Sequence, residues 1–84
     1  MKTNTMMREL ILEVVENQLN SGDPPETGVT YKRLLSSGMP ESEVRRLIAC
    51  VVASEIFDIQ KSQQPFGHDR FAKALSRLPE LPWD

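Results

Sequence analysis

The sequence has only one cysteine and one histidine among its 84 residues. The single cysteine, Cys50, excludes an internal disulfide and a zinc site built from several cysteines, and it is typical of a reducing compartment. The single histidine, His68, excludes metal sites that take two or more histidines from one chain. We therefore expect no cofactor held by residues of these two types.

Motifs that carry catalysis or phosphate binding are also missing. The four glycines lie far apart and form no phosphate-binding loop, and no G-x-S-x-G motif occurs. Glu9, Glu13 and Glu16 lie on the polar side of the first expected helix, where like charges are ordinarily solvated. No base is placed by the sequence to activate the thiol of Cys50. We therefore expect a protein that is not an enzyme.

Neither sign of charge dominates. Ten Lys and Arg stand against 12 Asp and Glu, which gives a net charge of −2. The adjacent basic pairs are Lys32-Arg33 and Arg45-Arg46, and the third expected helix starts with Glu41-Ser42-Glu43, which phosphates would repel. Nucleic-acid binding is therefore only the third-ranked hypothesis for function.

Long apolar runs are absent as well. The longest span residues 10–12 and 48–53, far short of the roughly 20 residues of a membrane-spanning helix. Acidic residues interrupt the apolar stretch near the start, which disfavours a signal peptide. We therefore expect a soluble, cytoplasmic protein without a membrane partner.

The apolar residues that are present recur at helical spacing. They predict helices over residues 5–21, 24–36, 41–61 and 68–78, followed by an irregular tail over 79–84. Asp23 is expected to cap the second helix, with Pro24 in its first turn. The third helix is apolar around most of its circumference, which predicts a central position. We therefore predict one all-α domain over residues 1–84, a compact bundle of about four helices around a long central third helix.

Two polar residues fall on apolar helix faces. At about 100° per residue, Gln18 lies about 20° from Ile11 and Glu55 about 20° from Ile48, each at the centre of its face. In one interpretation each side chain caps a backbone group at a nearby turn, or one of them faces a gap that is open to water. In another, the phase assigned to the helix is wrong. In a third interpretation, burial raises the pKa of Glu55, which then does chemistry or binds a ligand.

Two aromatic residues suggest an interaction surface. Phe57 lies on the back of the third helix, about 180° from Ile48, and Trp83 lies in the tail. Our preferred expectation is that the last helix and the tail cover Phe57. The alternative is an apolar patch left for a partner or a second copy of the chain.

The strings Glu16-Asn17-Gln18, Asp23-Pro24-Pro25-Glu26-Thr27 and Glu55-Ile56-Phe57-Asp58 occur in this order. Because of these strings and their order, the chain resembles a family of small bacterial all-helical domains of unknown function. The resemblance covers nearly the whole chain. The resemblance implies a cytosolic helical domain with no assigned activity.

Some members of that family carry histidines at the positions of Leu12, Ser42 and Arg46, which with Glu16 resemble a metal site shared by two helices. None of the three is histidine here, so the resemblance carries no metal site over to this chain. If these two helix edges meet, we expect Glu16 and Arg46 to form an ion pair instead.

The function that we expect is that of a protein-interaction or accessory module, whose partner is another protein or a second copy of the chain. The main alternative is a regulatory binder of a small ligand or metal, centred on Glu55 and Gln18. An apolar surface patch or a dimer would favour the first, a polar cavity that reaches Glu55 the second, and a clustered basic face would favour nucleic acid.

Overall fold

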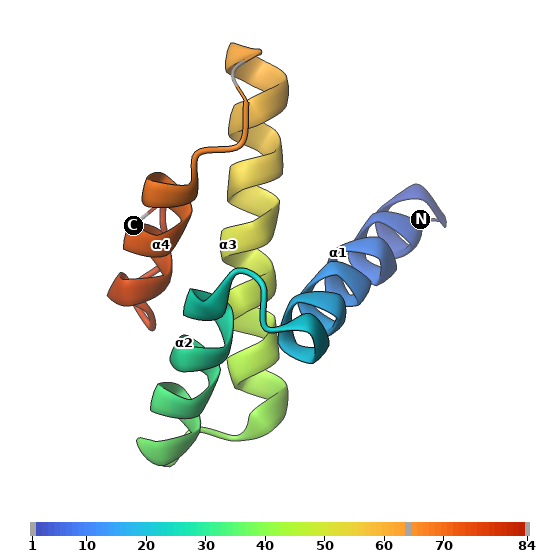
Figure 1. The fold of residues 1–84 in the computed structure, drawn as a ribbon. Helices are drawn as coiled ribbons and strands as arrows, with labels where there is room; N and C mark the ends of the chain where they lie inside the picture. Colours follow the sequence, from blue (N-terminus) through green and yellow to red (C-terminus); the bar gives the residue numbers. More distant parts are fainter. Residues whose placement is uncertain (1, 64, 84) are drawn as a thin grey trace.

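The computed structural model describes the backbone of residues 2–63 and 65–83, and side chains from residue 6 onward. It contains four helices (Figure 1): α1 (Lys2–Ser21), α2 (Pro25–Ser36), α3 (Glu41–Ser62) and α4 (His68–Arg77). Within the described ranges there is no strand, which confirms the predicted all-α class. None of these helices combines the length and the apolar content needed to cross a membrane. The predicted linker and tail include residues 64 and 84, which lie outside the described residues.

α3 is the central helix of the bundle. It packs against each of the other three helices, and α2 also packs against α1 and α4. Figure 1 shows α2 and α4 on one side of α3, while α1 diverges from α3 towards its own N-terminal end. The first half of α1 therefore stands apart from the rest of the bundle.

The buried core draws mainly on α3. Half of the ten buried apolar side chains found among the described residues come from this helix. The ten are Val15, Leu34, Val44, Leu47, Ile48, Val51, Val52, Phe71, Leu75 and Leu78. This distribution follows from the broad apolar face of α3, because a helix that is apolar on most sides must be covered on most sides.

The start of α2 differs from the sequence prediction. Pro24, not Asp23, is the capping residue, its backbone is extended, and no side chain caps the helix. The physical reason is the second proline, because a residue that precedes a proline is pushed out of the helical region. Pro24 precedes Pro25, so the helix begins one residue later than predicted.

Candidate functional site

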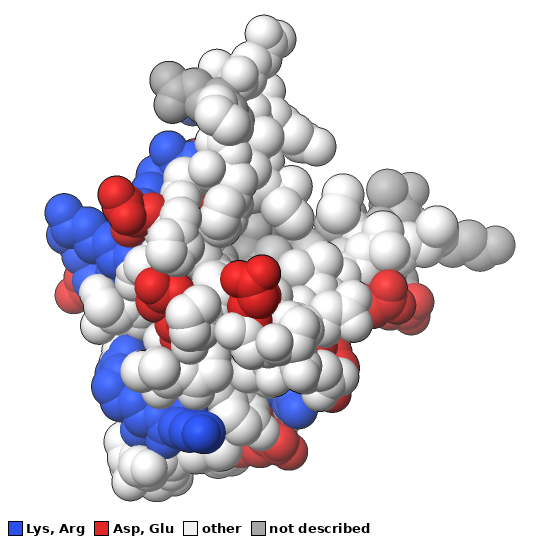
Figure 2. Space-filling model, in the orientation of Figure 1, with Lys and Arg blue, Asp and Glu red and all other residues white. Residues whose placement is uncertain are grey.

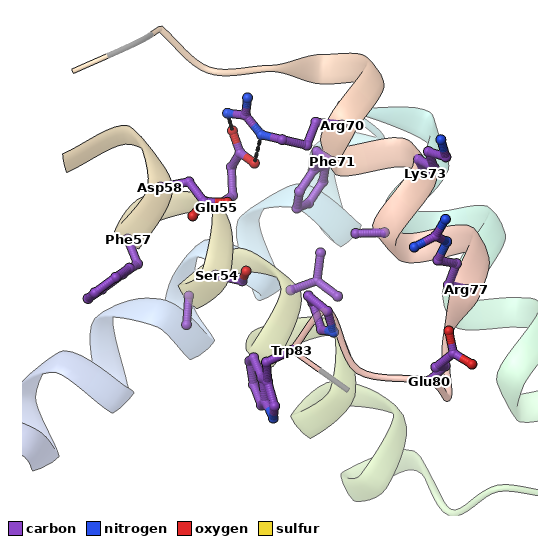
Figure 3. Close-up of a pocket in the computed structure, with 14 residues that line it drawn as sticks. Ser54, Glu55, Phe57, Asp58, Arg70, Phe71, Lys73, Arg77, Glu80 and Trp83 are labelled. Carbon is purple, nitrogen blue, oxygen red and sulfur yellow. Dashed lines mark hydrogen bonds and ion pairs between the residues drawn. The ribbon is translucent and has the colours of Figure 1, made fainter. Parts of the chain in front are cut away.

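Glu55 is buried as predicted, with 5% of its surface exposed. Its two carboxylate oxygens accept hydrogen bonds from Arg70 Nε at 3.0 Å and Arg70 Nη2 at 2.6 Å (Figure 3), and Oε2 also accepts one from the Gly67 N–H at 3.1 Å. Gly67 caps α4 and Arg70 lies in its first turn. The side chain of Glu55 therefore connects the start of α4 to the second half of α3.

The hydrogen bonds from Arg70 lower the pKa of Glu55 from its ordinary value, outweighing the opposite effect of burial. The interpretation in which burial raises this pKa is therefore wrong. Both carboxylate oxygens already have protein partners, so the contacts of Glu55 are those of a structural residue.

Gln18 makes a separate contact between α1 and α2. Its Oε1 accepts a hydrogen bond from the Thr27 hydroxyl at 2.9 Å, and Thr27 is fully buried. A cleft of about 700 Å³ between α3 and α4, which we call the α3–α4 cleft, reaches Glu55 but not Gln18. The structure therefore does not join Gln18 and Glu55 in that cleft.

Phe57 is not covered by α4 and the tail, contrary to our preferred expectation. Its side chain is 64% exposed and that of Trp83 is 61% exposed. The reason lies in the geometry of α3, where α4 packs on the side of Glu55. Phe57, two residues later, points about 200° around the helix from Glu55. In Figure 3 Phe57 points away from α4, and Trp83 lies alongside α3.

A second hollow lies between α1 and α3. This α1–α3 groove, of about 690 Å³, is lined mainly by apolar side chains from the diverging half of α1, by small residues of α3 and by Trp83. Its apolar lining consists of Met7, Ile11, Leu12, Ala49, Cys50, Ala53 and Trp83. Trp83 lines both the groove and the α3–α4 cleft, so it joins the two hollows.

α1 carries further exposed apolar side chains that do not line the groove. Met6, Leu10 and Val14 follow one another at four-residue spacing, and each is at least one-third exposed. We use the name apolar face for the exposed residues Met7, Leu12 and Trp83, which line the groove, together with Phe57, which lines the α3–α4 cleft with Trp83. In the view of Figure 2, the hollow between α1 and the upper half of α3 carries almost no charged side chains, whereas charges of both signs gather over α2 and α4.

Two of the three arginines that line the groove, Arg45 and Arg46, are paired within the chain. Arg46 binds both carboxylate oxygens of Glu43, at 2.9 and 2.6 Å, and this contact raises the pKa of Arg46. Glu16 pairs with Arg45, which also lies 3.6 Å from Glu41. The expected Glu16–Arg46 pair is therefore wrong. The two helix edges do meet, but Arg45 points towards α1 while Arg46, one residue on, reaches a glutamate of its own helix.

The positions of Leu12, Ser42 and Arg46 do come together, because all three line the α1–α3 groove. Across the described part of the chain, no group of three His, Cys, Asp or Glu side chains is placed to hold a metal ion. The groove lining does include the Glu43 carboxylate and the Cys50 thiol, but Glu43 is already bound by Arg46, and the other lining groups are mostly apolar or cationic, so the groove does not present a set of metal ligands.

Comparisons with family models, curated proteins and solved structures find no match to this chain. The resemblance to small bacterial helical domains stays a prediction. The candidate site must therefore be interpreted from its own geometry.

Sequence reasoning missed two features of this region. Arg70 is separated from Glu55 by 15 residues and a change of chain direction, so no local pattern connects them. The four-residue spacing of Met6, Leu10 and Val14 is visible in the sequence. Their exposure is not, because it depends on the divergence of α1 from α3.

His68 joins α4 to α2 on another part of the surface, where its Nε2 lies 3.0 Å from Glu26 Oε1. This contact raises the pKa of His68 from 6.5 and lowers that of Glu26 from 4.5, with smaller contributions to His68 from Asp69 and Asp23. The raised histidine pKa stabilises the fold below 6.5 and ceases to do so as the pH rises through the folded-state value. The lowered carboxyl pKa stabilises it above 4.5.

We therefore expect His68→Gln to reduce stability near pH 5.5, between the two ordinary pKa values, and to have much less effect near pH 8. Urea unfolding at the two pH values measures this difference. In the Glu26→Gln background the pH-dependent effect of His68→Gln should be much smaller, because only the contributions of Asp69 and Asp23 are left. An equal effect at both pH values would contradict the pairing.

Proposed function

We propose that this protein is a non-enzymatic protein-interaction or accessory module that binds its partner through the apolar face. The observation that carries the proposal is the joint exposure of Phe57 and Trp83, which both line the α3–α4 cleft, while Trp83 also lines the α1–α3 groove. Aromatic side chains are enriched at the centres of protein interfaces, where they supply a large share of the binding energy. Isolated exposed apolar residues are ordinary, but a group of four around two adjoining hollows is typical of an interaction site.

The same surface gives less support to the two alternatives. The α3–α4 cleft reaches Glu55, but Arg70 and Gly67 already occupy that carboxylate, so a ligand would have to displace them. Charges of both signs lie over α2 and α4 (Figure 2), and such mixing does not favour a phosphate backbone.

Photo-crosslinking in the cells that naturally make this protein tests the proposal. With p-benzoylphenylalanine in place of Phe57, we expect an adduct of discrete mass after irradiation, identified by mass spectrometry. Adding Trp83→Glu should abolish the adduct, because the charge would lie in the cleft that Phe57 also lines. The partner, once purified, should bind the Trp83→Glu variant at least about tenfold more weakly than the wild-type chain.

Val29 supplies the matched control. It is apolar and 66% exposed but lies on α2, outside the apolar face. The same crosslinker at Val29 should give no adduct of that mass. Equal adducts from both positions, or none from Phe57, would contradict the proposed function.

A further inference from the structure

The α1–α3 groove has the size and the lining of a small-molecule site. Its volume of about 690 Å³ lies within the roughly 300–1,000 Å³ that is typical of ligand pockets. Side chains between Met7 and Leu12 line it on α1, and side chains between Ser42 and Ala53 line it on α3. At about 1.5 Å per residue, the α3 side is about 17 Å long. The groove therefore has room for an elongated apolar molecule.

A protein helix fits this groove less well. A helix with its side chains is about 10–12 Å across, so a segment about 17 Å long has a volume of at least about 1,300 Å³. The groove has about half of that volume, so much of the helix would stay outside it. The dimensions therefore favour a thinner occupant, such as a single alkyl chain.

The charges of the groove favour an anionic group on that molecule. Three arginines and one glutamate are among the lining residues, whereas the whole chain has a net charge of −2. Arg45 and Arg46 already have carboxylate partners within the chain. Arg8 is exposed, and no acidic side chain among the described residues forms an ion pair with it. Its guanidinium is therefore available to bind a carboxylate through charge-assisted hydrogen bonds.

We propose that the α1–α3 groove binds a medium-chain fatty carboxylate. The alkyl chain lies along the apolar lining, which includes Ile11, Ala49 and Trp83, and the carboxylate accepts hydrogen bonds from Arg8. Small-molecule sites commonly combine such an apolar lining with a charged group that orients the ligand. The inference goes beyond the proposed function and does not depend on it, because this ligand needs no protein partner.

Equilibrium dialysis with radiolabelled decanoate tests the site. The wild-type chain should bind decanoate saturably at concentrations well below those at which it forms micelles. Decanol, which has the same chain length but no charge, should bind at least about tenfold more weakly. Hexanoate should also bind at least about tenfold more weakly, because fewer CH₂ groups leave water. The fluorescence of Trp83, the only tryptophan, should change in the same titration, because this side chain lines the groove.

Two pairs of variants locate the ligand. Arg8→Gln should weaken the binding of decanoate about tenfold and leave that of decanol unchanged, whereas Lys32→Gln, which removes an exposed cation from α2, should alter neither. Leu12→Glu places a carboxylate on the groove lining and should abolish the binding of decanoate. Leu10→Glu, a matched change on α1 outside the lining, should not. Far-ultraviolet circular dichroism checks that the variants fold, since all four replaced side chains are exposed.

The absence of saturable decanoate binding to the wild-type chain would overturn the inference. Decanoate binding that Arg8→Gln leaves unchanged, or that decanol equals, would overturn it as well, because the arginine would then not hold the carboxylate. Light scattering identifies the competing occupant. A mass of twice 9.5 kDa that Leu12→Glu returns to 9.5 kDa, in a chain that binds no decanoate, would assign the groove to a second copy instead.

Discussion

Replacing Phe71 with Ala is expected to lower the free energy of unfolding by about 3–5 kcal/mol. Phe71 is 1% exposed and is the bulkiest of the fully buried side chains described. It joins α4 to the core that α3 builds. A domain of this length has a total stability of only about 4–13 kcal/mol, so the variant should be partly unfolded or close to it at room temperature. Urea or thermal unfolding followed by circular dichroism measures the loss.

Phe66 provides the matched control for this substitution. Its ring lies 5.5 Å from that of Phe71, centroid to centroid, but half of its surface is exposed. Phe66→Ala removes the aromatic contact without opening a buried cavity, so we expect a loss of no more than about 1.5 kcal/mol. Similar losses for the two variants would show that α4 does not anchor in the core through Phe71.

Replacing Glu55 with Ala is expected to cost about 2–3 kcal/mol near neutral pH. The change removes the acceptor for the Gly67 N–H and the ionic partner of Arg70 at the start of α4. The Arg70 side chain is 43% exposed, so it can regain water, which limits the cost. Glu55→Gln keeps one oxygen acceptor and the side-chain volume, and we expect it to lose less than half as much.

The pH dependence of this effect gives a second test. The pKa of Glu55 is lowered from 4.5, so its contribution is present above that value and is lost as the pH falls through the folded-state pKa. The difference in unfolding free energy between the wild-type chain and the Ala variant should therefore shrink in acid. Glu13→Ala, which changes an exposed carboxylate on α1, serves as the control and should have little effect at any pH. A loss for Glu55→Ala that does not vary with pH would contradict the ion pair with Arg70.

The helical periodicity was sufficient to predict the class of fold and the central place of α3. Val44, Leu47 and Ile48 lie on an apolar face that repeats at helical spacing, and this repeat determines which side of α3 is buried whatever packs against it. The burial of Glu55 followed from the same arithmetic. The consecutive prolines at 24 and 25 were also sufficient to predict that α2 begins at Pro25, because Pro25 keeps Pro24 out of the helical region. Assigning the cap to Asp23 overlooked this effect.

Long-range contacts could not be predicted in this way. Whether Arg45 or Arg46 reaches Glu16 depends on the rotation of α3 against α1, and neighbouring residues on a helix point about 100° apart. An error of one residue in a predicted pair is the natural result of that geometry. The sequence likewise contained no local sign of the partnership between Glu55 and Arg70.

By itself, the sequence determined that this chain forms helices, that α3 supplies much of the core, and that no set of histidines or cysteines is present to build a metal site. These properties depend on residue type and on spacing along single helices. Only the tertiary structure decided that Glu55 is held by α4 and that Phe57, Trp83 and apolar side chains in the first half of α1 remain exposed. The reason is that exposure depends on the angles between helices, and these angles follow from the packing of the whole core rather than from the period of any one segment.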